Sequence, residues 1–234
     1  MDEPDLPRTF RDLTTPHVAD AVLRLGLPLR QAPADVRPIR AGLRVAGRAV
    51  PARHAGSVDV FLEALEGAEA GDVLVVDNAG RDDEACVGDL IALEVAQAGL
   101  AGIVIWGLHR DTVELHDIRL PVFSRGALAG GPQRLDAQEP DALTRARFGD
   151  HVITRDDVVL ADDDGVLFLP LDGVEEIAAA AERIRDTERE QAALLRQGTT
   201  LREQLRFAEY LASRDRDGTT FRQHLRTIGG AIEE

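Results

Sequence analysis

Residues 71–107 read GDVLVVDNAGRDDEACVGDLIALEVAQAGLAGIVIWG, and this stretch decides the fold class of the chain. Its two apolar runs, 72–77 and 102–107, are short and bounded by charged residues or glycine, which predicts two buried β-strands. Between them, residues 88–98 carry apolar side chains at the spacing of one helix face. Strand, helix and strand in this order predict a βαβ unit, whose parallel strands are joined by a right-handed crossover. The sequence therefore indicates an α/β protein.

A second pattern, at 157–170, consists of two apolar runs separated by the turn Asp162-Asp163-Asp164-Gly165. This turn imitates a calcium-binding loop, but Leu160 stands where such a loop has its first ligand, so a β-hairpin is predicted instead. The remaining predicted elements are helices at 15–25 and 58–65, strands at 43–53 and 121–124, and an irregular stretch at 125–140.

The composition changes at residue 172, after which glycine and β-branched residues become rare and Arg, Glu, Gln and Ala dominate. Three helix starts are predicted here from capping-box spacing: Asp172 with Glu175, Thr200 with Glu203, and Thr220 with Gln223. We therefore expect a compact, β-rich α/β/β core at 1–171 and a C-terminal helical extension at 172–234. The apolar positions of these helices lie on one face, which favours packing on a neighbouring subunit.

The charge balance excludes several classes of protein. The 234 residues include 27 basic and 42 acidic side chains, a formal charge of −15, so binding of nucleic acid through a basic face is not expected. All 27 basic residues are arginine. Without a lysine, the chain cannot be a Schiff-base aldolase, a pyridoxal-phosphate enzyme, a P-loop ATPase or a protein kinase, because each needs a lysine amine.

The number of cysteines and the amino-terminal residues indicate the cellular compartment. Cys86 is the only cysteine, which excludes intramolecular disulfides and a four-cysteine zinc site and fits a reducing compartment. Residues 1–5 are acidic where a signal peptide would be basic, and the longest apolar stretch, 98–108, is too short and too glycine-rich to span a bilayer. We therefore expect a cytoplasmic protein with neither membrane nor nucleic acid as a partner.

Three charged residues follow the two strands of the βαβ unit. Asp89 stands at the start of the predicted helix, and Arg110 and Asp111 come directly after the second strand. Because parallel strands end at the same sheet edge, where α/β sheets bind ligands, these residues are expected to lie together. Arg110 suits a carboxylate, and Asp111 offers an oxygen ligand for Mg²⁺ or Mn²⁺. Free N–H groups that also suit a carboxylate are expected at Gly88, Asp89, Leu90 and Ile91.

A simpler interpretation fits the same residues. In it, Asp89 caps its helix, and Arg110 and Asp111 form a surface ion pair. The spacing alone does not separate the two interpretations. The sequence has neither the HExxH motif of zinc peptidases nor the GxSxG motif of serine hydrolases, so those two chemistries have no support.

The segment Gly88-Asp89, followed by twenty residues and then Arg110-Asp111, resembles a family signature, D-x20-R-D. It is the signature of metal-dependent pyruvate aldolases that act on 4-hydroxy-4-methyl-2-oxoglutarate and 4-carboxy-4-hydroxy-2-oxoadipate. These enzymes share their fold with the regulator of ribonuclease activity A. The resemblance extends over roughly residues 15–198 and includes the apolar runs at 71–77 and 102–107 and the turn that begins at Asp162.

The resemblance implies a part for each matching residue. Arg110 contacts the substrate, Asp111 holds a divalent metal, Mg²⁺ or Mn²⁺, and Asp89 acts through a water on that metal. A glutamate from a neighbouring subunit completes the metal site, with Glu188 as the best match and Glu190 as a rival. The resemblance further implies homotrimers or homohexamers and a core similar to a swivelling phosphohistidine-type domain. The substrate carboxylate and keto oxygen are bound by Gly88, Asp89, Leu90 and Ile91.

The absence of lysine agrees with a metal route to pyruvate. Cleaving the C3–C4 bond of a 4-hydroxy-2-oxo acid leaves the enolate of pyruvate, which either a lysine imine or a metal can stabilise. The expected activity is therefore that of a carbon–carbon lyase, which releases pyruvate from a 4-hydroxy-2-oxo dicarboxylic acid. Oxaloacetate decarboxylation passes through the same enolate and is expected as a second reaction.

A second hypothesis is a non-catalytic regulator that binds a partner protein such as a ribonuclease. In the ribonuclease regulator the Arg-Asp pair is not intact, whereas Asp111 is present in this chain. This difference favours the enzyme. Release of pyruvate from an oxo acid separates the two hypotheses.

Overall fold

The computed structural model describes residues 5–228. Residues 1–4 of the acidic amino-terminal segment 1–5, and residues 229–234 of the predicted C-terminal extension, lie outside the described residues. In the described part of the chain, no helix is both long and apolar enough to cross a membrane.

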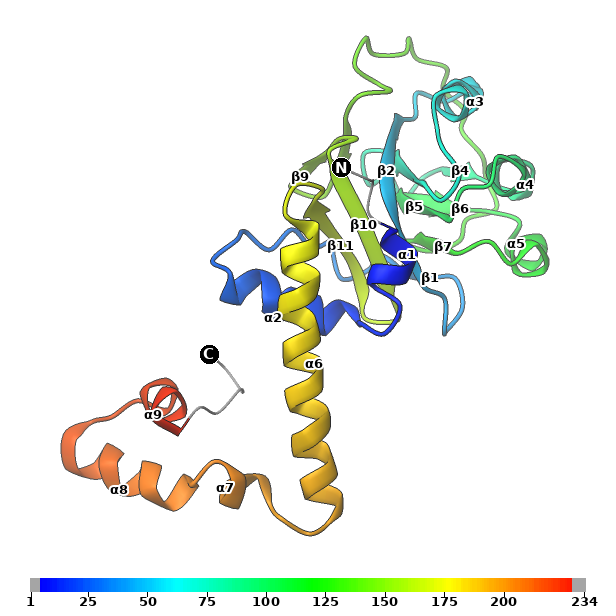
Figure 1. Ribbon diagram of the computed structural model, residues 1–234. Helices are drawn as coiled ribbons and strands as arrows, with labels where there is room; N and C mark the ends of the chain where they lie inside the picture. The colour runs from blue at the N-terminus through cyan, green and yellow to red at the C-terminus, as the bar shows by residue number, and fades with distance from the viewer. Residues whose placement is uncertain (1–4, 229–234) are drawn as a thin grey trace.

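Within residues 5–228, the central sheet has seven strands in the order β1-β7-β5-β3-β2-β10-β11 (Figure 1). The predicted βαβ unit is confirmed, because β3 and β5 pair in parallel with Val73 opposite Gly102. The predicted hairpin is also confirmed, with Asp162 opposite Gly165 at its turn. The strands are β1 (Arg37–Pro38), β2 (Val45–Arg53), β3 (Val73–Asp77), β5 (Gly102–Trp106), β7 (Val122–Ser124), β10 (Asp157–Asp162) and β11 (Gly165–Pro170).

The sheet curls so that its two edges approach each other. Near the β11 edge, the Ala32 N–H donates to the Val166 carbonyl at 2.9 Å, and Arg37 of β1 donates to the Asp164 carbonyl. The inner face encloses an apolar core closed by the small antiparallel pair β8 (Ala146–Phe148) and β9 (His151–Ile153). Residues of both strand faces are buried, which explains the continuous apolar runs in the sequence.

Two groups of helices cover the outer face of the curled sheet (Figure 1). The first group covers β2, β3 and β5 and consists of α3 (Asp59–Glu66), α4 (Asp89–Gln97) and α5 (Thr112–Ile118). The second covers β10 and β11 and consists of α1 (Leu6–Thr9), α2 (Thr15–Arg24) and α6 (Val174–Arg196). Asp162 fixes the start of α2, because its carboxylate accepts from the Thr15 N–H at 2.8 Å and the Thr15 hydroxyl at 2.6 Å. The α/β class with a β-rich core and C-terminal helices is therefore confirmed.

The long helix α6 joins the core to the end of the described chain. Its buried residues run from Val174 to Ile184 and pack against α2 and the hairpin. Beyond Ile184 the helix continues away from the sheet, and three shorter helices follow at its far end (Figure 1). These are α7 (Leu201–Gln204), α8 (Phe207–Asp217) and α9 (Phe221–Ile228).

The predicted start of α6 was wrong, whereas the two later capping boxes are confirmed. Gly173, in the left-handed conformation with φ 81°, is the N-cap of α6, and no side chain caps that helix end. Thr200 bonds reciprocally with Glu203, and Thr220 with Gln223. The extension has four helices in the described residues rather than the predicted three, because the chain turns at Arg206, with φ 47°, between α7 and α8.

Candidate functional site

A second parallel pair of strands positions the motif residues. The strands β4 (Ala85–Val87) and β6 (Leu108–His109) pair with Val87 opposite His109, and the Arg110 N–H donates to the Val87 carbonyl at 2.9 Å. Parallel strands end at the same edge, so the residues that follow them emerge side by side. The structure thus brings together Gly88, Asp89, Arg110 and Asp111, which we call the Asp111 site.

Asp111 directs its carboxylate toward the start of α4. The residue is the N-cap of α5 and has the left-handed conformation, with φ 59°, which aspartate tolerates better than most side chains. Its Oδ2 atom lies 3.4 Å from the Asp89 nitrogen and 3.3 Å from Arg110 Nε. A carboxylate, a guanidinium and a helix start therefore share one small region.

Gly88 leaves the space that this arrangement needs. Its backbone is extended, with φ −128°, so the glycine is not required by its conformation. A Cβ atom at this position would lie 2.3 Å from Asp111 Oδ2 and 3.2 Å from Arg110 Nε. Glycine is thus required by the close approach of the Asp111 carboxylate.

The first turn of α4 presents both its backbone and the Asp89 carboxylate. Asp89 Oδ1 accepts from the Leu90 N–H at 2.8 Å, and the Leu90 side chain is 74% exposed. The Ile91 side chain is buried in the core, so only its backbone N–H could face a ligand. The predicted cap was wrong, because Gly88 rather than Asp89 is the N-cap of α4 and no side chain caps that helix end. The other part of the simpler interpretation is observed, because Arg110 and Asp111 form a partly exposed ion pair.

The glutamates expected to complete the metal site lie on α6. Glu188 is half exposed, and its Oε2 atom is 3.3 Å from His17 Nε2 on α2. Glu190 is exposed on the same helix. The helix α6 packs on β10 and β11, whereas α4 and α5 pack toward the other end of the strand order, so one chain does not bring these glutamates to Asp111 (Figure 1). In the part of the chain that the structure describes, no group of three or more His, Cys, Asp and Glu side chains is placed to hold a metal ion.

His109, the residue before Arg110, holds the end of β6 in place beside the Asp111 site. The sequence did not reveal this role. Its buried ring lies between two hydroxyls, with Nδ1 2.7 Å from Ser124 Oγ and Nε2 3.0 Å from Thr112 Oγ1. Burial lowers the pKa of this imidazole, and the nearby His116 lowers it further. The ring is therefore neutral near pH 7 and fixes the strand end directly before Arg110. Its place in sequence beside the Arg-Asp pair was the available signal.

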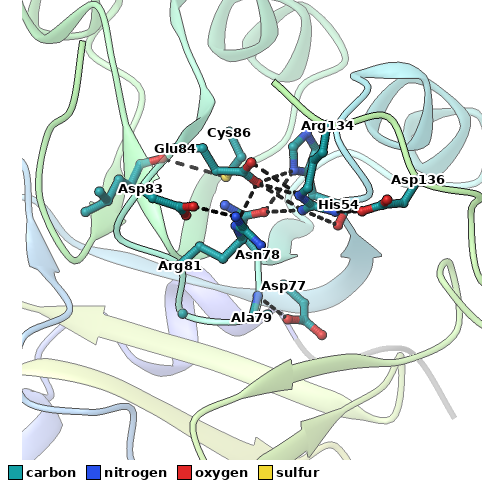
Figure 2. A network of polar contacts seen from close by, with 12 residues as sticks. His54, Asp77, Asn78, Ala79, Arg81, Asp83, Glu84, Cys86, Arg134 and Asp136 are labelled. Atoms are coloured by element: carbon teal, nitrogen blue, oxygen red, sulfur yellow. Dashed lines mark hydrogen bonds and ion pairs between the residues drawn. The ribbon is translucent and has the colours of Figure 1, made fainter. Parts of the chain in front are cut away.

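A buried polar network that sequence reasoning also missed lies at the carboxyl ends of β2 and β3 (Figure 2). Glu84 is buried and accepts three contacts from the Arg134 guanidinium, at 2.9 to 3.2 Å. Arg134 also donates to Asn78 Oδ1 at 3.1 Å, and the same oxygen lies 2.9 Å from His54 Nδ1. Burial lowers the pKa of His54. Asn78, directly after a buried strand, was the sequence signal for this network.

The network forms one wall of a cavity of about 500 Å³. The cavity lies where three adjacent strands end, because Arg53, Asp77 and Trp106 are paired neighbours at the last positions of β2, β3 and β5. We call it the arginine cavity, after the four arginines that line it: Arg53, Arg81, Arg134 and Arg147.

Cys86 lies on the short strand β4 and is a free cysteine. The thiol is buried, with Sγ 3.7 Å from the Leu108 carbonyl oxygen. Burial raises its pKa well above the usual range, so the thiolate is not populated near neutral pH. Cys86 is therefore a packing residue of the β4–β6 region rather than a nucleophile.

Comparison with known proteins identifies the family. A model of the RraA-like family, described as Aldolase/RraA, matches residues 15–168. Protein DlpA of Legionella pneumophila is 28% identical over 177 residues, which span 71% of this chain but 28% of DlpA. A protein of Halalkalibacterium halodurans named "Putative 4-hydroxy-4-methyl-2-oxoglutarate aldolase" is 26% identical over 182 residues, covering 77% of this chain and 84% of that protein.

The solved structures agree with the sequence comparison. RraAS2 of Streptomyces coelicolor, described as an unusual member of the RNase ES inhibitor RraA protein family, has a TM-score of 0.69 and 26% identity. The superposition covers 81% of this chain and 97% of RraAS2. Because the family model spans well over half of the sequence and the fold agrees, the chain belongs to the RraA-like family.

Proposed function

We propose that the chain is a divalent-metal-dependent aldolase that cleaves a 4-hydroxy-2-oxo dicarboxylic acid to pyruvate and also decarboxylates oxaloacetate. The observation that carries this proposal is the convergence at the Asp111 site. The Asp111 Oδ2 atom is 3.3 Å from Arg110 Nε. Both atoms lie so close to Gly88 that residue 88 has no room for a side chain. The name of the Halalkalibacterium relative supports the same activity.

The residues present at the Asp111 site fit a hard divalent cation. Asp111 offers a partly exposed carboxylate, and oxygen ligands of this kind are preferred by Mg²⁺ and Mn²⁺. The space that a Cβ at residue 88 would fill lies directly against that carboxylate. Asp111 would hold the cation, together with Glu188 or Glu190 of a neighbouring subunit. Bound there, the cation would supply a Lewis acid that stabilises the enolate of pyruvate.

Binding of the 2-oxo acid is assigned to the start of α4 and to Arg110. The N–H groups of residues 88–91 carry the positive end of the helix dipole, which favours a carboxylate. The Arg110 side chain is about half exposed and lies across Gly88, so its guanidinium can reach the same ligand. Its planar arrangement of donors matches a carboxylate or an enolate better than a point charge would.

Bond cleavage needs a base and a stabilised anion. The C4 hydroxyl loses its proton, the C3–C4 electron pair moves to C3, and the resulting enolate of pyruvate is later protonated at C3. We assign the role of accepting the hydroxyl proton, through water, to Asp89, which is partly exposed at the first position of α4. Arg110 stabilises the negative charge as it develops. In oxaloacetate, loss of CO₂ from C4 leaves the same enolate.

A neighbouring subunit would complete this site. One chain contributes a single strong metal ligand, and exposed apolar side chains flank it, with Leu90 at 74%, Val113 at 71% and Leu93 at 40% exposure. Such a cluster beside a polar site is typical of a surface that another chain covers. We therefore propose a homotrimer or homohexamer in which the helical extension at 172–234 packs on a neighbouring subunit. The single buried thiol agrees with a cytoplasmic location.

The second candidate function is that of a non-catalytic regulator. It is favoured by the similarity to RraAS2, which is described within a family of RNase ES inhibitors. The helices α7 to α9, which project from the core, would then contact the partner protein (Figure 1). This candidate predicts no release of pyruvate from any oxo acid.

A coupled assay of pyruvate release separates the two functions. Oxaloacetate and a small panel of 4-hydroxy-2-oxo acids would be tested with Mg²⁺, with Mn²⁺ and with EDTA. The enzyme hypothesis predicts release that chelation abolishes and added cation restores. Release of pyruvate that chelation leaves unchanged would exclude the metal route.

A further inference from the structure

Two glycines flank the Arg110 side chain. A Cβ atom at Gly88 would lie 3.2 Å from Arg110 Cγ, and a Cβ atom at Gly131 would lie 2.8 Å from Arg110 Nη1. Gly88 thus approaches the aliphatic part of the side chain, and Gly131 approaches the end of the guanidinium. The φ of Gly131 lies outside the left-handed region, so glycine is required there by the close approach of Arg110 rather than by the backbone.

Backbone hydrogen bonds tie the loop that contains this second glycine, residues 126–134, to both strands of the Asp111 site. The Leu128 N–H donates to the carbonyl of His109, on β6, at 2.9 Å. The N–H of Ala85, on β4, donates to the Gly130 carbonyl at 2.8 Å. The two strands that present the Asp111 site therefore also fix the residue directly after Gly130.

Arg134 anchors the far end of the loop in the buried polar network (Figure 2). Its guanidinium donates to the Glu84 carboxylate at 2.9 to 3.2 Å and to Asn78 Oδ1 at 3.1 Å. The Glu84 side chain is 4% exposed, and this residue directly precedes β4. A buried carboxylate that loses its partner becomes an uncompensated charge, so the ion pair strongly favours one position of the loop. The network thereby supports Gly131, three residues before Arg134.

The terminal nitrogens of Arg110 are held in place without being bonded. Arg110 Nε lies 3.3 Å from Asp111 Oδ2, and within residues 5–228 neither terminal nitrogen of Arg110 has a hydrogen-bond partner. An exposed arginine that turns freely must be ordered when an anion binds, which weakens the binding. The contact with Gly131 limits the positions open to the guanidinium and leaves both terminal nitrogens available to a ligand. A charged donor that is held in this way is preorganised for an anion.

We infer that Gly131 is a positioning residue of the Asp111 site, which holds the Arg110 guanidinium where the enolate forms. The buried Glu84–Arg134 pair holds Gly131 in turn. Through this loop, the polar network at the ends of β2 and β3 supports the Asp111 site on β4 and β6. The inference rests on the proposed function, since it gives the contact a part in the release of pyruvate.

Gly131→Ala tests the contact, and Gly130→Ala is its matched control. The Cβ atom added at residue 131 must displace Arg110 Nη1 by about 0.6 Å, from 2.8 Å to an ordinary contact of 3.4 Å. A Cβ atom at residue 130 would meet nothing within 4 Å. Because Nη1 is the end of a flexible side chain, both full-length variants should unfold at the wild-type temperature.

The first readout does not depend on catalysis. In protein labelled with ¹⁵N-arginine, the Nε–H resonance of Arg110 is identified by its absence from the Arg110→Lys spectrum. We expect Gly131→Ala to shift this resonance and Gly130→Ala to leave it at the wild-type position. A role of Gly131 in the loop alone would not move it.

The second readout is the kinetics of oxaloacetate decarboxylation under saturating Mg²⁺. A displacement of about 1 Å can cost on the order of 100-fold in rate, so the smaller displacement in Gly131→Ala should lower kcat about tenfold. KM should change less than about twofold, because Arg110 acts on charge that develops in the transition state. Gly130→Ala should keep the wild-type kcat and KM.

Arg134→Gln tests the support of the loop. Without the guanidinium, Gly131 is held less firmly, so the Arg110 resonance should shift and kcat should fall as they do in Gly131→Ala. If this variant does not fold, because Glu84 is left buried without a partner, Arg134→Lys takes its place, since an ammonium keeps the charge but not the planar donors. A folded Arg134 variant with the wild-type resonance and kcat would overturn the assignment of the ion pair.

A wild-type Arg110 resonance or a wild-type kcat in Gly131→Ala would overturn the inference, as would equal effects of Gly131→Ala and Gly130→Ala. A wild-type protein that releases no pyruvate would instead contradict the proposed function, whatever the resonance shows. The failure of the inference and the failure of the proposed function are therefore distinguishable.

Discussion

Gly88→Ala tests the geometry of the Asp111 site with a single methyl group. The extended backbone at Gly88 is one that alanine adopts readily, so the substitution should leave the fold intact. The added Cβ would lie 2.3 Å from Asp111 Oδ2, a separation that carbon and oxygen atoms do not tolerate. The carboxylate, which is partly exposed and free to move, must therefore shift.

The size of that shift sets the expected effect. Restoring an ordinary contact of at least 3.4 Å from 2.3 Å requires a movement of about 1 Å by the Asp111 carboxylate. A misplacement of about 1 Å in a catalytic constellation can cost on the order of 100-fold in rate. We therefore expect kcat for oxaloacetate decarboxylation to fall about 100-fold, with a higher cation concentration needed for half-maximal rate.

Gly130→Ala is the matched control. Gly130 lies in the loop beside Arg110, it does not have a positive φ, and an added Cβ there would meet nothing within 4 Å. Both variants would be compared with the wild type by pyruvate release under saturating Mg²⁺ and by thermal unfolding. The control should retain wild-type turnover, and all three proteins should unfold at similar temperatures.

A Gly88→Ala protein with wild-type kcat and unchanged cation dependence would contradict the proposed role of the Asp111 carboxylate. It would mean that the position of the Asp111 carboxylate does not matter for turnover. Equal losses in Gly88→Ala and Gly130→Ala would also contradict it, because the second variant creates no contact.

Four further predictions follow from the structure. Arg110→Lys conserves charge but removes the planar donors, so kcat should fall on the order of 100- to 1000-fold while KM changes little; a silent variant would indicate an exposed ion pair. Asp111→Asn should abolish turnover in a protein whose circular dichroism is unchanged. Burial lowers the pKa of His54 and of His109, so the unfolded chain binds protons at these residues more readily than the folded chain below about pH 6.5. The free energy of unfolding, measured by urea denaturation, should therefore decrease as the pH is lowered below that value. Sedimentation at micromolar concentration should give at least three chains of 25.4 kDa, and a monomer mass would contradict the proposed assembly.

The sequence predicted the elements whose pattern is local. The apolar runs of β3 and β5 and the hairpin of β10 and β11 are buried on both faces, and such strands are visible as continuous apolar residues. The capping boxes at Thr200 and Thr220 form as predicted, since they need only residues three apart. The pairing of β4 with β6 was not predicted, because strands of two or three residues carry no periodic signal.

What the sequence missed depends on contacts between distant residues. The tight turn through Leu171 and Val174 places Gly173, rather than Asp172, at the start of α6. The His54 ring finds its partner Asn78 only because β2 and β3 are neighbours in the sheet. No spacing rule links these residues along the chain.

The sequence predicted which residues form the Asp111 site but not how they contact one another. The expectation that Asp89 and Asp111 lie together came from their places after two parallel strands, whereas the close approach at Gly88 and the support from His109 depend on contacts that no sequence pattern shows. The assignment of a glutamate on α6 to a metal held by another subunit stays a prediction, because it depends on contacts between chains.

Metal-dependent catalysis at Asp111 is decided by measuring the release of pyruvate from oxaloacetate with and without divalent cation. We expect turnover with Mg²⁺ or Mn²⁺, its loss on adding EDTA and its return when the cation is restored in excess. We expect no turnover by Asp111→Asn under any of these conditions. Turnover by Asp111→Asn equal to that of the wild type would contradict this function, as would a folded, oligomeric wild-type protein that releases no pyruvate from oxaloacetate or from any 4-hydroxy-2-oxo acid.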